Sequence, residues 1–378
     1  MKIQRLTRAG IITGVVALAA GSAAAQPVTA LDSIGGGVYS RAEDINDLGQ
    51  VVGASSNGTA IEATVWDRGA ASGLGIDKGT DHSFAMAINN NGEATGYSEI
   101  GANAGENTNA KSALFWGSGG LINIGASMGL TSSRGNDINN NGVVAMQGNK
   151  PGGTAGYAWN TTMGGTQAGA DPIYDFGSNF GINDRNNIVG YAAAGFDGAQ
   201  AIHTTFNGAG WDVGTEIGPQ AVRDPAAAEA ISNTGIVVGQ GGDGKAHIFE
   251  AAMFTLNPKD PVNWLGKLAG FDDSSAHDVN DSGLVVGHST FFGIAVDQRA
   301  VAWADGQIFD LNNLLHAGSD FAVLVSATGV NNNGDIVGYG LLNSGEVSAF
   351  VINGFVPAPG AAVALLGGIA AFGRRRRS

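Results

Sequence analysis

The sequence predicts an all-β fold, a seven-bladed β-propeller-like ring of repeats that are each about 47 residues long. Three observations predict it. One hairpin-forming phrase occurs seven times, further strand-like segments follow each copy, and 62 of the 378 residues are Gly. This much Gly without a three-residue period excludes collagen and suits many tight turns between short strands.

The repeated phrase consists of an apolar residue, Asn or Ser, two polar residues and Gly, followed by a short return strand. Its copies begin at steps of 43, 50, 44, 49, 48 and 51 residues, at Ile45, Ile88, Ile138, Ile182, Ile231, Val279 and Val330. The Asn side chain can bond the backbone two residues on, and Gly supplies a positive φ beside a bulge. Each copy therefore predicts a β-hairpin. In the fourth copy Asn186 replaces Gly, and Asn tolerates the same left-handed conformation.

A third and a fourth strand are expected after each hairpin. The third usually carries an aromatic residue, at Trp66, Trp116, Trp159, Phe206, Phe254, Trp303 or Phe350. The fourth is weaker and lies near Leu74, Leu121, Ile173, Trp211, Asn263 or Ile308. Four short strands per repeat match one propeller blade. We expect the tryptophans to pack between blades, although such residues can also stack on sugars.

The last blade needs a strand from the other end of the chain. The seventh copy ends at Asn353 without a fourth strand, and residues 31–35 resemble the missing segment. We expect this N-terminal strand to complete the seventh blade, because a closed ring has no exposed edge strands. A β-solenoid is the alternative, and there Leu31 would lie far from Val351.

Residues 1–25 have the three-part form of a secretory signal peptide. Lys2, Arg5 and Arg8 form a positive segment, an apolar run follows over residues 11–20, and small residues end it. We expect cleavage after Ala25, at the site formed by Ala23, Ala25 and Gln26. The repeat domain then covers residues 26–354.

Residues 355–378 form a sorting tail. It begins with Val356, Pro357, Ala358, Pro359 and Gly360, continues as a short apolar helix over residues 361–373, and ends with Arg374, Arg375, Arg376 and Arg377. A transmembrane helix of thirteen apolar residues is short for the hydrocarbon core of a bilayer, which is about 30 Å thick. We therefore expect a transient membrane association, with the arginines on the cytoplasmic side.

Two parts of the chain resemble known protein families. The tail resembles the PEP-CTERM sorting signal, with Ala358 where that family has Glu, and the resemblance implies an exosortase-like enzyme that processes it. The repeats resemble the HAF repeat family of extracellular bacterial proteins. Residues 88–92, 113–116 and 310–311 carry its hairpin, its aromatic strand and its Asp-Leu segment. That family implies export and repetition, and no agreed activity.

Charge and composition exclude several functions. The net charge is −14, and seven of the 19 basic residues lie in the two terminal segments, which leaves 12 against 33 acidic residues, or −21, between them. Such a surface repels nucleic acid and anionic membranes. Cys is absent, so disulfides, zinc fingers, iron–sulfur clusters and thiol chemistry are excluded.

No catalytic or metal-binding constellation is predicted, and no cofactor is expected. Residues 125–129 fit G-x-S-x-G, but the helix that a nucleophile elbow needs is not predicted after them. Residues 137–142 fit half of a calcium loop, and Gly148 stands where the bidentate Glu belongs, so only weak Ca²⁺ binding at the Asn-rich tips is possible. His277 and His288 flank one hairpin and could approach each other, although without a third ligand they make a poor metal site, and loop histidines that are solvated or hydrogen-bonded are favoured.

The sequence therefore predicts a secreted protein of a bacterial cell surface or extracellular matrix, with a structural, adhesive or binding role and no enzymatic activity. The expected partners are the export machinery, the sorting enzyme and extracellular polysaccharide or surface components. The alternative is a hydrolase or lyase that acts on extracellular polysaccharide. It would require several Asp, Glu or His side chains from different blades to converge at the channel mouth.

Overall fold

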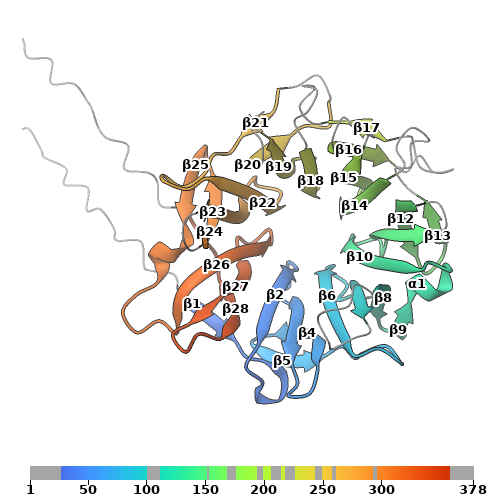
Figure 1. Cartoon of the computed structure of the whole chain (residues 1–378), viewed down its shortest axis with the longest axis horizontal. Helices are drawn as coiled ribbons and strands as arrows, with labels where there is room; N and C mark the ends of the chain where they lie inside the picture. Colours follow the sequence, from blue (N-terminus) through green and yellow to red (C-terminus); the bar gives the residue numbers. More distant parts are fainter. Residues whose placement is uncertain are drawn as a thin grey trace, which may run out of the picture.

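The computed structural model describes residues 27–99, 111–150, 153–167, 176–193, 199–205, 214–217, 226–242, 249–257, 261–292 and 296–357. Within these ranges the strands form seven four-stranded antiparallel sheets, which stand around one central axis (Figure 1). The predicted seven-bladed propeller is confirmed.

The first three blades follow the chain from the inner strand outward. They comprise β2 (Ser40–Ile45), β3 (Val51–Ser56), β4 (Ile61–Asp67) and β5 (Ala70–Gly73); β6 (His82–Ile88), β7 (Ala94–Glu99), β8 (Lys111–Gly117) and β9 (Gly120–Asn123); and β10 (Ser132–Ile138), β11 (Val144–Lys150), β12 (Gly153–Asn160) and β13 (Gly164–Gln167).

The remaining blades use the same order. They comprise β14 (Phe176–Ile182), β15 (Asn187–Ala193), β16 (Ala199–Thr205) and β17 (Thr215–Glu216); β18 (Ala226–Ile231), β19 (Val237–Gly242), β20 (Phe249–Phe254) and β21 (Asn263–Trp264); β22 (Asp273–Val279), β23 (Val285–Phe292), β24 (Val296–Ala304) and β25 (Gln307–Asp310); and β26 (Phe321–Val330), β27 (Ile336–Leu342) and β28 (Val347–Ile352), completed by β1 (Val28–Leu31).

Helices are short in the described part of the chain. They are η1 (Ile34–Gly36), α1 (Ile124–Ser127) and η3 (Leu311–Leu314). None of the helices within these ranges has the length and apolar character needed to cross a bilayer. The predicted apolar helix over residues 361–373 lies outside the described residues.

The ring is closed by the N-terminal strand, as the sequence predicted, but three residues earlier than expected. β1 pairs antiparallel with β28, so that Val28 lies opposite Ile352 and Leu31 opposite Ala349. The predicted strand over residues 31–35 is wrong beyond Leu31, because Gly35 and Gly36 have φ values of 64° and 75° and form η1. A left-handed backbone cannot continue a strand.

Two predicted fourth strands are also misplaced. In the third blade this strand is Gly164–Gln167 and not the segment at Ile173, since Phe176 already begins the inner strand of the next blade. In the fourth blade it is the two-residue Thr215–Glu216, which follows the predicted segment at Trp211. Outer strands carry few buried residues, so hydrophobic pattern places them poorly.

The seven hairpin turns have the predicted geometry. The fourth residue of the turn has positive φ in every copy, at Gly49, Gly92, Gly142, Asn186, Gly235, Gly283 and Gly334. In six copies the Asn Oδ1 accepts the backbone N–H two residues on, for example Leu48 N–H to Asn46 Oδ1 at 3.1 Å. The predicted turn is therefore confirmed.

The departure at Asn186 has a structural reason. In the second copy Asn89 Nδ2 donates to Glu93 Oε2 at 2.8 Å. The third copy has Val143 at the position of Glu93, which offers no side-chain acceptor. Asn139 Nδ2 donates instead to Asn186 Oδ1 of the following blade, at 2.7 Å. The residue that replaces Gly thus supplies the acceptor that Val143 removed.

A β-bulge interrupts every inner strand at the same place. In the first blade Ala42 pairs with Gly53 and Asp44 with Val52, which leaves Glu43 as the extra residue. The corresponding register shifts recur in the other six blades. A Cβ on Gly53 would lie 2.0 Å from the carbonyl oxygen of Arg41, so the bulge explains the last Gly of the repeated phrase.

The core lies between blades, where the predicted packing role of the tryptophans is confirmed. Trp66, Trp116, Trp159 and Trp303 are at most 5% exposed. One core cluster joins Leu31, Trp66, Val337 and Ala349, and therefore connects the first blade to the last. Closure consequently buries apolar surface as well as pairing two strand edges.

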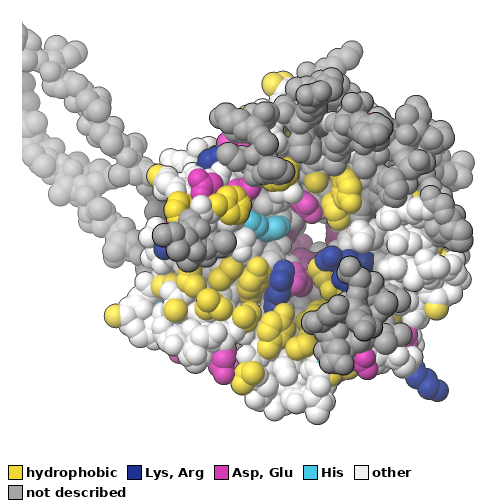
Figure 2. Space-filling view, viewed as in Figure 1, with side chains coloured by type: hydrophobic (Ala, Val, Ile, Leu, Met, Phe, Trp, Pro, Cys, Tyr) yellow, Lys and Arg dark blue, Asp and Glu magenta, His cyan; other side chains and the backbone are white. Residues whose placement is uncertain are grey.

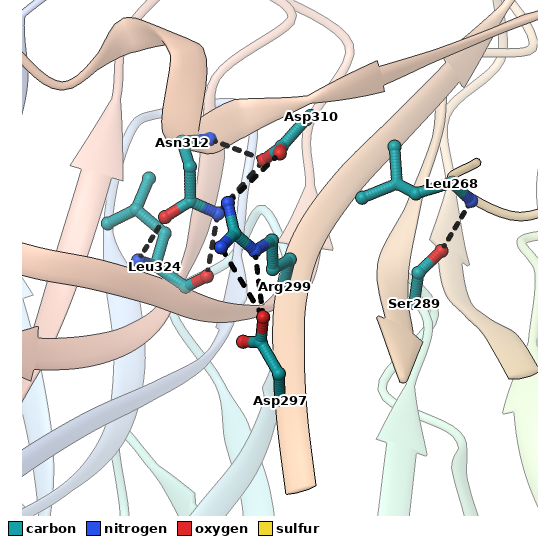
Figure 3. A network of polar contacts seen from close by, with 7 residues as sticks. All are labelled: Leu268, Ser289, Asp297, Arg299, Asp310, Asn312 and Leu324. Carbon is teal, nitrogen blue, oxygen red and sulfur yellow. Dashed lines mark hydrogen bonds and ion pairs between the residues drawn. The ribbon is translucent and has the colours of Figure 1, made fainter. Parts of the chain in front are cut away.

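Serine hydroxyls connect adjacent blades near the start of four inner strands. They accept the backbone N–H of an Ala in the third strand of the preceding blade, at 2.9–3.0 Å, and are Ser40, Ser83, Ser133 and Ser274. At the last junction the amide of Asn312 replaces this contact by exchanging two hydrogen bonds with the backbone of Leu324, at 2.8 and 3.0 Å (Figure 3). Each connection satisfies backbone groups that blade packing removes from water.

Candidate functional site

The seven bulge residues face one cavity at the axis of the ring. Unlike the turns and the core, they vary, with six residue types in seven blades, and they are Glu43, Met86, Asn136, Phe180, Glu229, His277 and Thr328. The cavity has a volume of about 500 Å³, and we call it the channel chamber. Figure 2 shows acidic, basic and histidine side chains gathered around the central opening. The bulge re-aims one side chain per blade toward this axis.

A second tier of side chains completes the channel chamber. Inner strands add Arg41, Phe84, Arg134 and Ser326, Tyr39 contributes from just before β2, and the adjacent strands add Tyr97, His288 and Tyr339. Sequence reasoning identified only the two histidines among these residues. Glu43, Glu229 and His277, from three different blades, line this one cavity.

Arg41 and Glu43 form a close ion pair in the channel chamber. Arg41 Nε lies 2.6 Å from Glu43 Oε1, and the guanidinium carbon lies 4.3 Å from the ring centroid of Tyr339. Burial is the largest single influence on Arg41 and opposes its charge, but Glu43, Tyr339 and Tyr39 together outweigh burial and raise the Arg41 pKa. Burial raises the pKa of Glu43 despite the attraction of Arg41 and Arg134. The positive charge of Arg41 is therefore largely satisfied within the protein.

Arg134 is held differently. Its guanidinium carbon lies 5.3 Å from the ring centroid of Tyr97, which stacks on Phe84 at 5.0 Å. Its Nη2 lies 3.4 Å from the sulfur of Met86, which is a weak acceptor. Within the described ranges Arg134 forms no ion pair, and its buried Nε has no hydrogen-bond partner.

His277 and His288 meet across the sixth blade, as the sequence suggested was possible. His277 Nε2 lies 2.8 Å from His288 Nδ1, so one ring donates to the other. Burial, reinforced by His288, lowers the pKa of His277 to about 3, and burial lowers the pKa of His288 to about 4. The expected hydrogen bonding of these histidines is therefore present, but they lie on β22 and β23 and not in loops. The pair is neutral near pH 7.

Glu229 is the carboxyl group with the least support from its surroundings. Burial raises its pKa to about 7, and only Arg134 opposes this effect. No hydrogen bond or ion pair to its side chain occurs among the described residues. A carboxyl with a pKa near neutrality can exchange a proton at the pH of many extracellular environments.

Three buried aspartates join neighbouring blades. Asp44, Asp137 and Asp278 each follow a bulge residue. Each accepts a backbone N–H from the next blade at 2.7–2.8 Å. Burial raises the pKa of all three, to about 6 for Asp44, to about 7 for Asp137 and well above the ordinary value for Asp278. Mutual repulsion adds to the effect of burial.

The hairpin tips form a closed ring of hydrogen bonds at the other end of the channel. In each tip, the side chain of the second residue after the apolar position accepts the backbone N–H of the equivalent residue in the preceding blade, at 2.7–2.9 Å; Asn90 Oδ1, for example, accepts from Asp47 N–H. The acceptors are Asp47, Asn90, Asn140, Asp184, Asn233, Asp281 and Asn332, so no two aspartates are adjacent. This order keeps like charges apart.

The tips have little capacity left for a cation. Their side-chain oxygens accept hydrogen bonds from neighbouring tips and enclose a small cavity of about 140 Å³. In the described part of the chain, no group of three His, Asp or Glu side chains is arranged to hold a metal ion. These oxygens bind the ring together instead of a ligand.

Most residues of the predicted export and sorting signals lie outside the described ranges. These are Ala23, Ala25, Gln26, Ala358, Pro359, Gly360 and Arg374 to Arg377. Val356 is exposed, directly after Phe355, which packs against the last blades.

The G-x-S-x-G segment is no nucleophile elbow. Ser127 is the last residue of α1, and its hydroxyl donates to the backbone oxygen of Ile124 at 2.7 Å. An elbow places the nucleophile before a helix and not at its end. Ser127 is also absent from the lining of the channel chamber.

Comparison with protein-family models gave no match, and comparison with curated proteins gave none. Several solved structures share the fold. The β-propeller domain of the Trilobed protease from Pyrococcus furiosus is 13% identical, with a TM-score of 0.50 over 86% of this chain and 95% of that one. Virginiamycin B lyase from Staphylococcus aureus is 9% identical, with a TM-score of 0.50 over 86% and 99%.

A structure from a study of two prolyl endopeptidases is 10% identical, with a TM-score of 0.52 over 84% of this chain and 47% of that one. At these identities the likeness concerns the propeller fold alone. Similar propellers therefore occur in proteins of different activity, and the function of this chain has to be argued from its own site.

Proposed function

We propose that this chain is exported by its N-terminal signal, is sorted to the cell surface or extracellular matrix by its C-terminal tail, and binds a ligand in the channel chamber. One observation supports binding above all. The bulge positions carry six residue types in seven blades, with only Glu occurring twice, while the turns and the core repeat. Folding alone would be served by one residue type at this position in all blades.

The chemistry of the channel chamber suits a polar ligand of moderate size. Its volume of about 500 Å³ lies within the range of small-molecule pockets. It offers charged groups, phenols, hydroxyls and an amide, together with the aromatic rings of Phe84 and Phe180. An extracellular polysaccharide, bound through one or two of its sugar residues, fits this combination.

A blocking substitution tests the binding role. Thr328→Trp fills the channel chamber, whereas Leu48→Trp adds the same side chain at an exposed hairpin tip. We expect the first variant to lose binding to the glycan that the mature chain selects from an array, and the second to retain it. Circular dichroism verifies that both are folded. Equal binding by both variants would place the ligand elsewhere.

The sorting role is tested at the tail. Replacing Arg374, Arg375, Arg376 and Arg377 with Ala removes the charges that would hold the tail on the cytoplasmic side. We expect the variant chain to leave the membrane fraction without processing of its tail, while the unaltered chain is shortened and reaches the surface. An unchanged distribution between cell fractions would contradict the sorting proposal.

A second candidate function is the cleavage of an extracellular polysaccharide. The observation that favours it is Glu229, a carboxyl whose pKa is raised to about 7 beside the neutral histidine pair. Such a group can act as a general acid or base. Incubation of the chain with its bound glycan should then release new reducing ends or unsaturated products, and Glu229→Gln should abolish the release. Turnover that is unchanged in this variant would exclude Glu229 as the acid or base.

A further inference from the structure

The channel chamber contains one cation without an ion pair. Arg41 is paired with Glu43, whereas Arg134 forms no ion pair within the described ranges and acts on the carboxyls of Glu43 and Glu229 only from beyond ion-pair distance. Its Nε is buried without a hydrogen-bond partner. An unpaired charge in a partly buried site is unfavourable unless an anion completes it. The chain as a whole is strongly acidic, with 33 Asp and Glu against 19 Lys and Arg, so a spare cation on its axis is unexpected.

The guanidinium of Arg134 is also preorganised. The ring of Tyr97 lies against one side of it, at 5.3 Å from the guanidinium carbon, and Tyr97 is itself stacked on Phe84. Met86 contacts Nη2. A held guanidinium loses little conformational entropy when a ligand binds, and its planar fork of N–H donors matches a carboxylate.

The surroundings of Arg134 indicate what carries the carboxylate. Tyr39, Ser326 and Tyr339 line the same cavity and supply hydroxyl groups. A fatty acid would leave these groups without partners, whereas the hydroxyls of a sugar ring can bond them. The volume of the channel chamber admits a sugar ring with its carboxylate.

We propose that the channel chamber recognises a uronate, a sugar ring that carries a carboxylate, and that Arg134 is the residue that binds this carboxylate. The proposal rests on the ligand-binding function above and specifies its ligand class. The shared chemistry is that of a free sugar acid and of an acidic residue within a polysaccharide.

Calorimetric titration of the folded mature chain tests the proposal with four probes. These are an oligouronate, a neutral oligosaccharide of equal length, free glucuronate and acetate. We expect the oligouronate to bind at least tenfold more tightly than the neutral oligosaccharide. Arg134→Gln should weaken oligouronate binding by about 10- to 100-fold, the loss expected for a charge-assisted hydrogen bond. Arg134→Lys should fall between the two, because it keeps the charge and loses the fork.

Arg68→Gln is the matched control, since the Arg68 side chain is 95% exposed and lies outside the channel chamber. Circular dichroism and the thermal midpoint show whether each variant is folded. Equal affinity for acidic and neutral oligosaccharides, with Arg134→Gln harmless, overturns the uronate proposal and leaves saccharide binding intact. Binding of no saccharide overturns the proposed function as well. Acetate that competes as well as glucuronate shows that the sugar ring contributes nothing, and overturns the assignment to uronates.

Discussion

Raising the pH through 7 ionises Glu229 inside the channel chamber, and the folded protein should lose stability as it does. Burial raises the pKa of this carboxyl from 4.5 to about 7. The folded chain therefore binds the proton more tightly than the unfolded chain. Between these two pH values the folded state holds more protons, so the free energy of unfolding falls as pH rises, and it levels off above 7.

The magnitude follows from the difference in pKa. One pKa unit corresponds to about 1.4 kcal/mol, so the interval from 4.5 to about 7 corresponds to about 3 kcal/mol of unfolding free energy. Arg134, His277 and Phe180 line the cavity with Glu229, and of these Arg134 is the group whose charge opposes the shift. Glu229→Gln keeps the shape of the side chain and removes its titration.

Urea denaturation at pH 4.5 and pH 8 measures the effect. Relative to the unaltered chain, Glu229→Gln should gain about 3 kcal/mol more at pH 8 than at pH 4.5. The buried aspartates and the histidine pair titrate in both proteins, so their contributions cancel in this comparison. Glu346→Gln, at an exposed position, is the control and should show no such difference. The reasoning is refuted if Glu229→Gln has the same pH dependence as the unaltered chain.

Three further predictions concern the ring itself. Asn233→Asp places a carboxylate between Asp184 and Asp281 and should lower the free energy of unfolding by about 2 kcal/mol at pH 7. Thermal melts should show that much of this loss is recovered at pH 4, and an equal loss at both pH values would contradict the charge argument. Asn186→Ala should lower the free energy of unfolding by about 1–2 kcal/mol in urea titrations. Asn186→Gly should change it little, because Gly adopts the positive φ without strain and this gain offsets the lost hydrogen bond. Equal effects of the two substitutions would refute this account. Deletion of residues 27–31 should expose the edge of β28 and produce aggregates in sedimentation experiments, and a stable monomer would show that closure by β1 is dispensable.

The hairpins could be predicted because their determinants are local. Asn46 and Gly49 specify a turn through one side-chain hydrogen bond and one positive φ, and neither depends on the rest of the chain. The outer strands depend on their neighbours instead. β17 is only two residues long, and the one buried residue next to it, Ile217, lies just after its end. The apolar pattern around Trp211 is stronger, so it led the sequence prediction to the wrong segment.

The channel chamber escaped prediction because a bulge inverts the alternation of faces. In a regular strand every second residue lies on the same face, so Glu43 and Arg41 would share the packed face of the buried Ile45. The extra residue at the bulge puts Ala42 on the packed face, where it is fully buried, and turns Arg41 and Glu43 toward the axis. The same inversion hides the corresponding residues of the other blades.

One signal in the sequence does mark the bulge. The repeated phrase ends in Gly within a strand in most copies, where Gly is otherwise unfavourable. At Gly53, Gly96 and Gly287 a Cβ would lie 1.9–2.0 Å from a carbonyl oxygen of the inner strand, so the bulge requires Gly there. A repeated turn followed by a strand Gly therefore identifies the residue three places before the first turn residue, such as Glu43 before Asn46, as one that faces the channel. In a propeller with this phrase, the residues at that position, and not the regular aromatics, are those in which blades can differ without loss of packing.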